Sequence, residues 1–211
     1  MAMKARIVTL VAVAFLALGS PPVRGQSALP PAGSKASQLD ETGQVVLRGQ
    51  LTPYRIRHLP VTSYPELPAW IQIQLSQRSC LIPQTYQAHR PENVIHGRFQ
   101  GPGTSDWAVL CSAKGTVSLL VFFGSEPEKA MVLATVQETE RLQEHDASGV
   151  LGFNWGIDPA SPQRVHEAQI SLEHRPPWLD HDALADSLLD RHTVYHFYAG
   201  SAWTLLNVPD N

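Results

Sequence analysis

Apolar and polar residues alternate with a period of two in several segments between residue 93 and the C-terminus. The clearest pairs are residues 106–112 with 116–123, and residues 192–198 with 202–206. Each pair is separated by three residues that include a glycine, the spacing of a short β-hairpin loop. Further strands are predicted at residues 44–50, 93–99, 131–137 and 163–172. Consecutive hairpins of this kind predict an antiparallel meander.

One segment has helical periodicity instead. Ser63 and Glu66 fit a capping box, and proline is tolerated in the first turn that follows. The apolar residues Leu67, Trp70, Ile71 and Leu75 then fall on one stripe. We therefore predict a helix near residues 64–78 that covers one face of the sheet. Residues 180–190 fit either a short helix or a loop.

The N-terminus has the three parts of a secretory signal peptide. Lys4 and Arg6 precede an uncharged apolar run, and small residues stand near a cleavage site. The run covers residues 7–19 and rises about 20 Å as a helix, short of the roughly 30 Å hydrocarbon core. A membrane anchor or a buried N-terminal helix is therefore the poorer interpretation. We expect cleavage after Gly25, with Ala28 as the alternative.

Three parts of the chain follow from these patterns: a signal peptide at 1–25, a flexible leader at 26–43 and a single β-rich domain at 44–211. The leader is rich in Pro, Ala, Ser and Gly and has too little apolar surface to pack. The predicted fold class is α+β, mainly an antiparallel β-meander with one covering helix. The expected location is the periplasm or the medium, and no stable membrane anchor remains after cleavage.

The two cysteines, Cys80 and Cys111, are expected to form a disulfide in an oxidising compartment. A loop of this length would stabilise the fold by about 3–4 kcal/mol in the chain-entropy model. The alternative is a catalytic or redox thiol, but the sequence has no C-x-x-C pattern. We expect the bridge to join the end of the predicted helix to the first hairpin.

The charge balance makes nucleic acid a poor partner. The chain has 16 basic and 19 acidic residues, a net charge of −3. Removing Lys4, Arg6 and Arg24 with the signal peptide leaves 13 against 19, or −6. An acidic chain without Lys/Arg clusters also lacks the attraction needed to dock on anionic lipid.

Residues 97–109 read GRFQGPGTSDWAV, which resembles the FG-GAP repeat of integrin-like (VCBS-type) β-propellers. The matching positions are Gly97, Phe99, Gly101, Gly103, Asp106, Ala108 and Val109. There is no second copy, and a propeller needs several blades. The chain is therefore similar to exported bacterial proteins that carry one degenerate FG-GAP-like hairpin.

The FG-GAP resemblance implies a loop that often binds calcium through oxygens at alternating positions. Those positions are occupied here by Arg98, Gln100, Pro102 and Asp106. Only Asp106 keeps a carboxylate, whereas calcium wants six to eight oxygen ligands. We expect the turn to survive without calcium binding.

The chain has nine histidines, and some of those in its C-terminal part stand near several acidic residues in the sequence. Asp180, His181, His192 and His196 could ligate zinc, because three protein ligands and an open position make a catalytic site. The alternative is an acidic loop followed by a strand with two ordinary histidines. No HExxH or similar spacing supports the metal.

No motif indicates a nucleophilic enzyme. The chain has no G-x-S-x-G elbow and no Gly-rich phosphate loop.

Trp155 and Trp178 lie in loop-like sequence and are the candidate surface binding residues. The favoured hypothesis is an exported non-catalytic binding or structural module with no cofactor and a protein or glycan partner. The alternative is a metal-dependent hydrolase using the cluster around 180–196.

Overall fold

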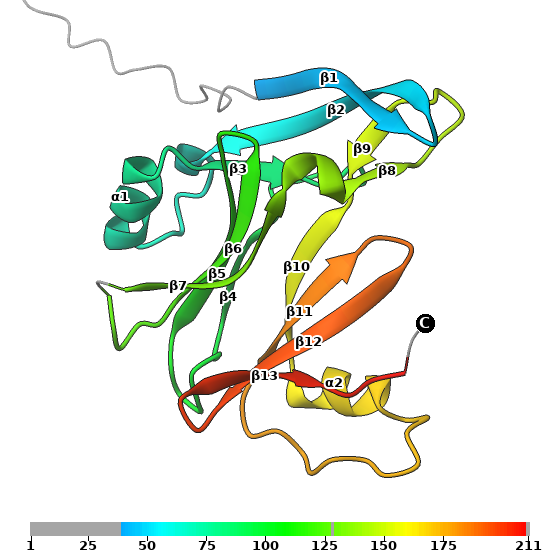
Figure 1. Cartoon of the computed structure of the whole chain (residues 1–211). Helices are drawn as coiled ribbons and strands as arrows, with labels where there is room; N and C mark the ends of the chain where they lie inside the picture. Colours follow the sequence, from blue (N-terminus) through cyan, green and yellow to red (C-terminus); the bar gives the residue numbers. More distant parts are fainter. Residues whose placement is uncertain (1–38, 128, 210–211) are drawn as a thin grey trace, which may run out of the picture. The chain divides into compact units, whose positions relative to one another are not determined.

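The computed structural model describes residues 39–127 and 129–209 (Figure 1). The predicted signal peptide and the first part of the predicted leader lie outside the described residues. The first strand, β1, begins at Leu39, so residues 39–43 belong to a strand and not to a flexible leader. They are held there because β1 pairs with the next strand along its whole length.

The fold is a β-dominated α+β fold, as predicted at that level. The first sheet contains β1 (Leu39–Leu47), β2 (Gln50–Pro60), β3 (Leu81–Gln84), β4 (Val94–Gly97), β5 (Asp106–Ala113), β6 (Thr116–Phe122), β7 (Ala130–Gln137), β8 (Leu142–Glu144) and β9 (Leu151–Phe153). The second sheet contains β10 (Trp155–Ala160), β11 (Ala183–Leu188), β12 (His192–Ala199) and β13 (Ala202–Leu206). The helical segments are η1 (Val61–Ser63), α1 (Ala69–Gln77), η2 (Glu138–Arg141) and α2 (Pro162–Ala168), of which η1 and η2 are 3-10 helices.

The prediction of a simple antiparallel meander holds only in part. The second sheet is antiparallel, with consecutive strands as neighbours. The nine-stranded first sheet has the order β7-β6-β5-β3-β2-β9-β8, with β1 on β2 and β4 on β5. Its β2 and β9 are parallel, so the sheet is mixed. This pair joins segments that are almost a hundred residues apart in the chain. No local sequence pattern predicts a pairing over that distance.

The two hairpins with clear loop signals form as predicted. The β5–β6 turn places Lys114 and Gly115 at φ of 55° and 75°, and the β12–β13 turn places Gly200 and Ser201 at 58° and 69°. Two consecutive residues with positive φ give a turn whose twist matches that of the flanking strands. The β1–β2 hairpin was not predicted, because the strand predicted at residues 44–50 includes the residues that form its turn.

The predicted helix is present but shorter than residues 64–78. It begins after Pro68, which makes no side-chain cap, so the expected capping box at Ser63 is not used. The chain before it forms turns around the buried Tyr64. Ile71 and Leu75 are fully buried, as their spacing predicted, and Trp70 lies edge-on to Phe122.

Two segments of the C-terminal half differ from the prediction. Most of the predicted strand at 163–172 is helix α2, which begins because Ser161 Oγ accepts from the Arg164 N–H and Pro162 occupies the first turn. Residues 183–188, predicted as helix or loop, form β11 between β10 and β12. Ala183, Leu184 and Ala185 are all buried, so the polar alternation of a half-exposed strand is missing.

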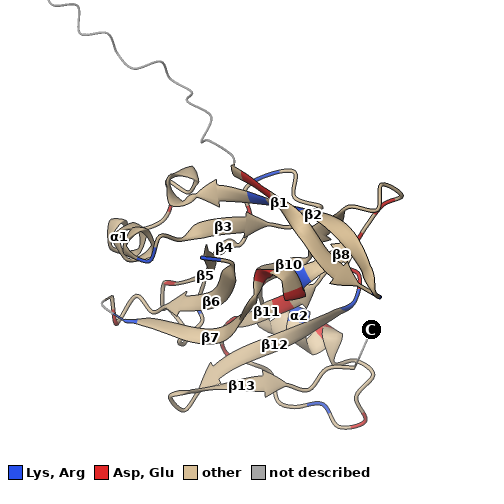
Figure 2. Ribbon diagram, turned by 45° about the horizontal axis from the view of Figure 1, so that its top comes forward, with Lys and Arg blue, Asp and Glu red and all other residues tan. Residues whose placement is uncertain are grey.

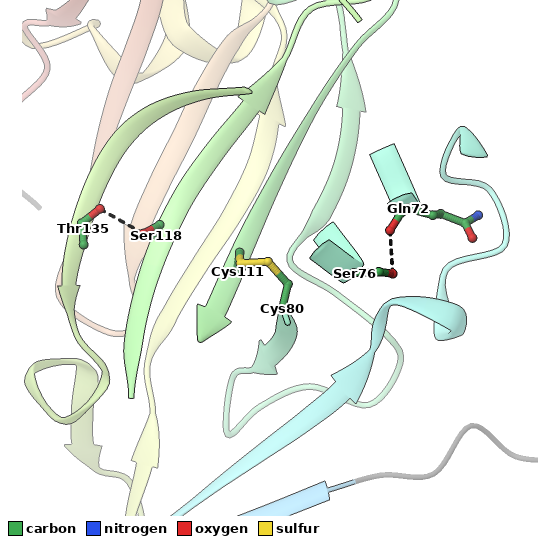
Figure 3. Close-up of a disulfide and its surroundings, with 6 residues drawn as sticks. All are labelled: Gln72, Ser76, Cys80, Cys111, Ser118 and Thr135. Atoms are coloured by element: carbon green, nitrogen blue, oxygen red, sulfur yellow. Dashed lines mark hydrogen bonds between the residues drawn. A yellow bond between two sulfur atoms is a disulfide. The ribbon is translucent and has the colours of Figure 1, made fainter. Parts of the chain in front are cut away.

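The predicted Cys80–Cys111 disulfide is present, with a Cα–Cα distance of 5.1 Å (Figure 3). It joins the end of α1 to β5, next to the apolar cluster that α1 covers. A second cluster, which includes Phe153, Trp155 and Leu184, packs the two sheets against each other. Among the described residues, no helix is long and apolar enough to span a membrane.

Candidate functional site

Strand β2 presents two chemically different faces. Arg55 and Arg57 lie on one face, while Tyr54, Ile56 and His58 lie on the other, because side chains alternate along a strand. Ile56 is 1% exposed, so its face is turned to the core. The two arginines therefore face away from the core, toward a cleft.

The cleft has a volume of about 450 Å³ and is lined by Asp40 of β1 and by three further parts of the chain. Arg55 and Arg57 come from β2, Gln84 and Tyr86 from the end of β3 and the residues after it, and His145 and Gly152 from the β8–β9 hairpin. The parallel pairing of β2 with β9 sets Gly152 beside Arg55. The cleft thus depends on the long-range pairing that made the meander prediction incomplete.

A stacked pair of rings forms one wall. The Tyr86 and His145 rings lie 4.4 Å apart and nearly parallel, at 7°. Gly152 permits this approach, because a Cβ there would lie 2.6 Å from Tyr86 Cβ and 2.8 Å from His145 Cδ2. The Tyr86 hydroxyl donates to Asp190 at 2.5 Å. Burial and the hydrogen bond to Asp190 raise the pKa of Tyr86 to about 12, so the phenol stays protonated at neutral pH.

The two arginines of the cleft have different partners. Arg55 forms an ion pair with Asp40 at 2.5 Å. Arg57 Nη2 donates to the Ala88 carbonyl at 2.7 Å, and its buried Nε has no hydrogen-bond partner among the described residues. No described carboxylate forms an ion pair with Arg57. Arg57 therefore brings to the cleft a guanidinium that has no ion pair with a described carboxylate and whose hydrogen-bonding capacity is only partly used.

The hydroxyl and imidazole in the cleft are not arranged as a nucleophile and base. Ser148 Oγ donates to Asp146 at 2.5 Å, and His145 Nδ1 lies 3.4 Å from the same carboxylate. The hydroxyl is thus directed to the acid and not to the imidazole, whereas a catalytic triad needs it on the imidazole. The hydrogen bonds from Ser148 also lower the pKa of Asp146, which keeps it ionised.

The prediction that Trp155 is a surface binding residue is wrong. Trp155 is 0% exposed, its Nε1 donates to Asp186 at 2.6 Å, and the Arg141 guanidinium lies 4.7 Å from its ring centroid. The pairing of β10 with β11 turns this side chain into the core. Trp178 is 60% exposed and stacks on His166 at 4.0 Å, so the two tryptophans share no surface.

The structure does not gather Asp180, His181, His192 and His196 into a metal site. His181 is buried, with Nδ1 2.5 Å from Asp180 and Nε2 2.9 Å from the Tyr198 carbonyl, so both ring nitrogens are occupied. His196 pairs with Asp186 at 3.1 Å, and His192 is exposed on the same strand. In the described part of the chain, the one group of three side chains that could hold a metal is Glu41, His58 and Glu138, on the core face of β2. No motif marks these residues, because they are brought together by strand pairing.

Asp106 organises the loop that joins β4 to β5. Its buried carboxylate accepts from the backbone N–H groups of Gln100, at 2.8 Å, and Gly124, at 3.0 Å, and also from the Thr104 hydroxyl. These donors occupy the oxygens that the FG-GAP resemblance would assign to a cation. The carboxylate therefore holds the loop by hydrogen bonds.

Arg98 connects the same loop to the second sheet. Its Nη2 lies 3.0 Å and its Nε 3.2 Å from the two carboxylate oxygens of Asp182, which directly precedes β11. Two backbone groups of the same residues also pair, since the Asp182 N–H donates to the Arg98 carbonyl at 3.2 Å. The loop is thus a junction between the two sheets.

Fold and site together define a disulfide-bonded, β-dominated α+β protein with a cleft beside β2, β3 and β9 of its larger sheet. Comparisons of the chain with protein-family models, with curated proteins and with solved structures gave no match.

Proposed function

We propose that this protein is an exported, non-catalytic binding module whose cleft at β2 captures a small carboxylate-bearing molecule. The observation that supports the ligand class is Arg57, a cleft guanidinium without an ion-pair partner among the described residues. A guanidinium fork matches a carboxylate with two parallel hydrogen bonds. The cleft volume also falls within the range for small-molecule sites, roughly 300–1,000 Å³.

The other lining groups suit a polar ligand such as a sugar acid. Gln84 and Thr85 border the cleft, and the Tyr86–His145 stack gives one flat wall. Arg55 forms an ion pair with Asp40, and Asp146 accepts hydrogen bonds from Ser148, so Arg57 is the lining group that is offered to a carboxylate of the ligand. We therefore expect selectivity for a single carboxylate over a neutral molecule of the same shape.

The test compares the binding of glucuronate with that of glucose, its neutral counterpart. Binding is measured by isothermal titration calorimetry and by the NMR chemical-shift changes of cleft residues. Glucuronate is expected to bind and glucose is not. Arg57→Gln should weaken binding at least about tenfold, because a charge-assisted pair contributes roughly 1.5–3 kcal/mol. Arg78→Gln is the matched control, since Arg78 is an exposed arginine that follows α1, outside the cleft. Absence of glucuronate and citrate binding at millimolar concentration would overturn the ligand class.

We further infer that the β4–β5 hairpin is a degenerate FG-GAP-like element whose loop no longer takes calcium. The contacts of Asp106 with backbone N–H groups, and a guanidinium at Arg98, support this interpretation. Millimolar calcium should leave the melting temperature within about 1 °C of its metal-free value, because only a bound ligand stabilises the native state. A clear rise in melting temperature that is absent in Asp106→Asn would contradict it.

A further inference from the structure

A histidine and two glutamates meet on the core face of β2. Glu41 belongs to β1, His58 to β2 and Glu138 to η2, and one potential ligand atom of each lies within 4.8 Å of the others. The register explains the first two: Glu41 is the direct partner of Ile56, so it shares the face on which His58 lies two residues further on. This is the face opposite to Arg55 and Arg57, so the cluster is separate from the cleft.

Glu138 is the unusual member of this cluster. It is 1% exposed, and its Oε1 lies 2.6 Å from His58 Nε2, while His58 is itself 2% exposed. The other oxygen, Oε2, is buried and has no hydrogen-bond partner among the described residues. A buried carboxylate is costly unless a cation or hydrogen-bond donors satisfy it. The carboxylate therefore has a free oxygen beside two further ligand atoms.

We propose that Glu41, His58 and Glu138 bind a divalent transition-metal ion. One imidazole nitrogen with carboxylate oxygens suits zinc, manganese or iron, whereas calcium and magnesium prefer oxygen ligands alone. The two carboxylates balance the charge of a divalent cation. Three protein ligands leave a fourth position of a tetrahedral zinc site open.

Small side-chain movements bring the cluster to metal-binding geometry. Bonds of about 2.0–2.2 Å in a tetrahedron place neighbouring ligand atoms about 3.4 Å apart. The His58–Glu138 contact of 2.6 Å must open slightly and Glu41 must approach. Glu41 is exposed and can adjust, and the Tyr54 hydroxyl, 3.4 Å from Glu41 Oε1, is placed to orient it. Gly43 leaves room for the Tyr54 ring, since a Cβ there would lie 2.7 Å from it.

A metal at this position would fasten the edge strand β1 to the interior of the first sheet. It would join the β1–β2 hairpin, through Glu41 and His58, to η2 through Glu138. Metal binding to the native state stabilises it by mass action. This role does not depend on the proposed cleft ligand, because the two sites occupy opposite faces of β2.

The experiment titrates the full chain, prepared without a histidine tag, with Zn²⁺ and counts bound metal by native mass spectrometry. One equivalent is expected, together with a rise in melting temperature. Glu41→Gln should lower zinc affinity at least about tenfold and keep the fold, because Glu41 is exposed. Glu140→Gln, which changes an exposed acid of the same η2 segment, should bind zinc like the unaltered chain.

Two further variants distinguish this site from the histidines of β12. His58→Gln should abolish stoichiometric binding, and a folded circular dichroism spectrum shows that the loss is not caused by unfolding. His192→Ala should bind zinc normally, since His192 lies outside the cluster. Loss of binding in His192→Ala with retention in Glu41→Gln would overturn the assignment. Absence of any zinc binding at micromolar concentration would overturn it too.

Discussion

At the scale of single residues, Trp155 is held on several sides by its neighbours. Its ring is fully buried between the sheets, its Nε1 donates to Asp186, and Arg141 lies against one ring face. A buried tryptophan stabilises the fold through the large apolar area that it removes from water, and the hydrogen bond of its N–H fixes the orientation of the ring. Trp178 has one stacking partner, His166, and is mostly exposed.

Trp155→Ala should therefore lower the free energy of unfolding by about 3–5 kcal/mol, the usual cost of emptying a large aromatic site. Trp178→Ala should cost about 1 kcal/mol or less, because a surface substitution loses little more than a stacking contact. Urea unfolding of both variants measures the difference. A Trp155→Ala variant as stable as Trp178→Ala would contradict the burial described above.

At the scale of elements, the Arg98–Asp182 pair joins the β4–β5 loop to the start of β11. Burial raises the pKa of Asp182, but the hydrogen bonds and charge of Arg98 more than offset this, so its pKa is below the ordinary 3.8. The unfolded chain then binds a proton more readily than the folded chain, so stability rises with pH in this range. The contribution is complete above about pH 4 to 5 and is lost as the pH falls through the folded pKa.

Asp182→Asn should thus destabilise the protein on the order of 1 kcal/mol at pH 6 and much less near pH 2 to 3. Unfolding by urea at the two pH values gives the comparison. Asp158→Asn is the control, because Asp158 is 61% exposed and lies 4.0 Å from Arg164, so its substitution should change stability little at either pH. A pH-independent effect of Asp182→Asn would show that the pair does not act through ionisation.

At the scale of the whole molecule, the acidic and basic positions are interspersed in short segments along the ribbon (Figure 2). The disulfide holds α1 against β5, and the second sheet is attached through a shared core. These features are compatible with the proposed export, because two linked cysteines remain oxidised in an oxidising compartment.

The proposed export makes a prediction about the intact mass of the chain recovered from the exported fraction. The mass should correspond to a chain that begins at Gln26 or nearby and lacks the two thiol hydrogens of Cys80 and Cys111. Treatment with a reductant should add those two hydrogens. An uncleaved chain, or one with free thiols, would contradict the export proposal.

Part of the fold could be predicted from the sequence, whereas most of the candidate site could not. The loop at Asp106 and the turn at Lys114–Gly115 are recognisable in the sequence, because they depend on residues close together in the chain. Glycine allows the positive φ of the turn, and the Asp106 carboxylate binds backbone N–H groups of its own loop. The cleft joins Arg57, Tyr86 and His145 from three separate segments. Strand alternation could have put Arg55 and Arg57 on one face, but only the parallel β2–β9 pair gives that face a cleft.

By itself, the sequence determined the β-rich class, the two glycine-containing hairpins, the apolar stripe of α1 and the disulfide. Each depends on a local pattern or, for the cysteines, on there being a single possible pair. Only the tertiary structure decided that Ala183–Leu188 is a central strand, that Trp155 is buried and that Glu41 and Glu138 meet His58. Those outcomes depend on pairings between distant segments, whose energy appears only when both partners are in place.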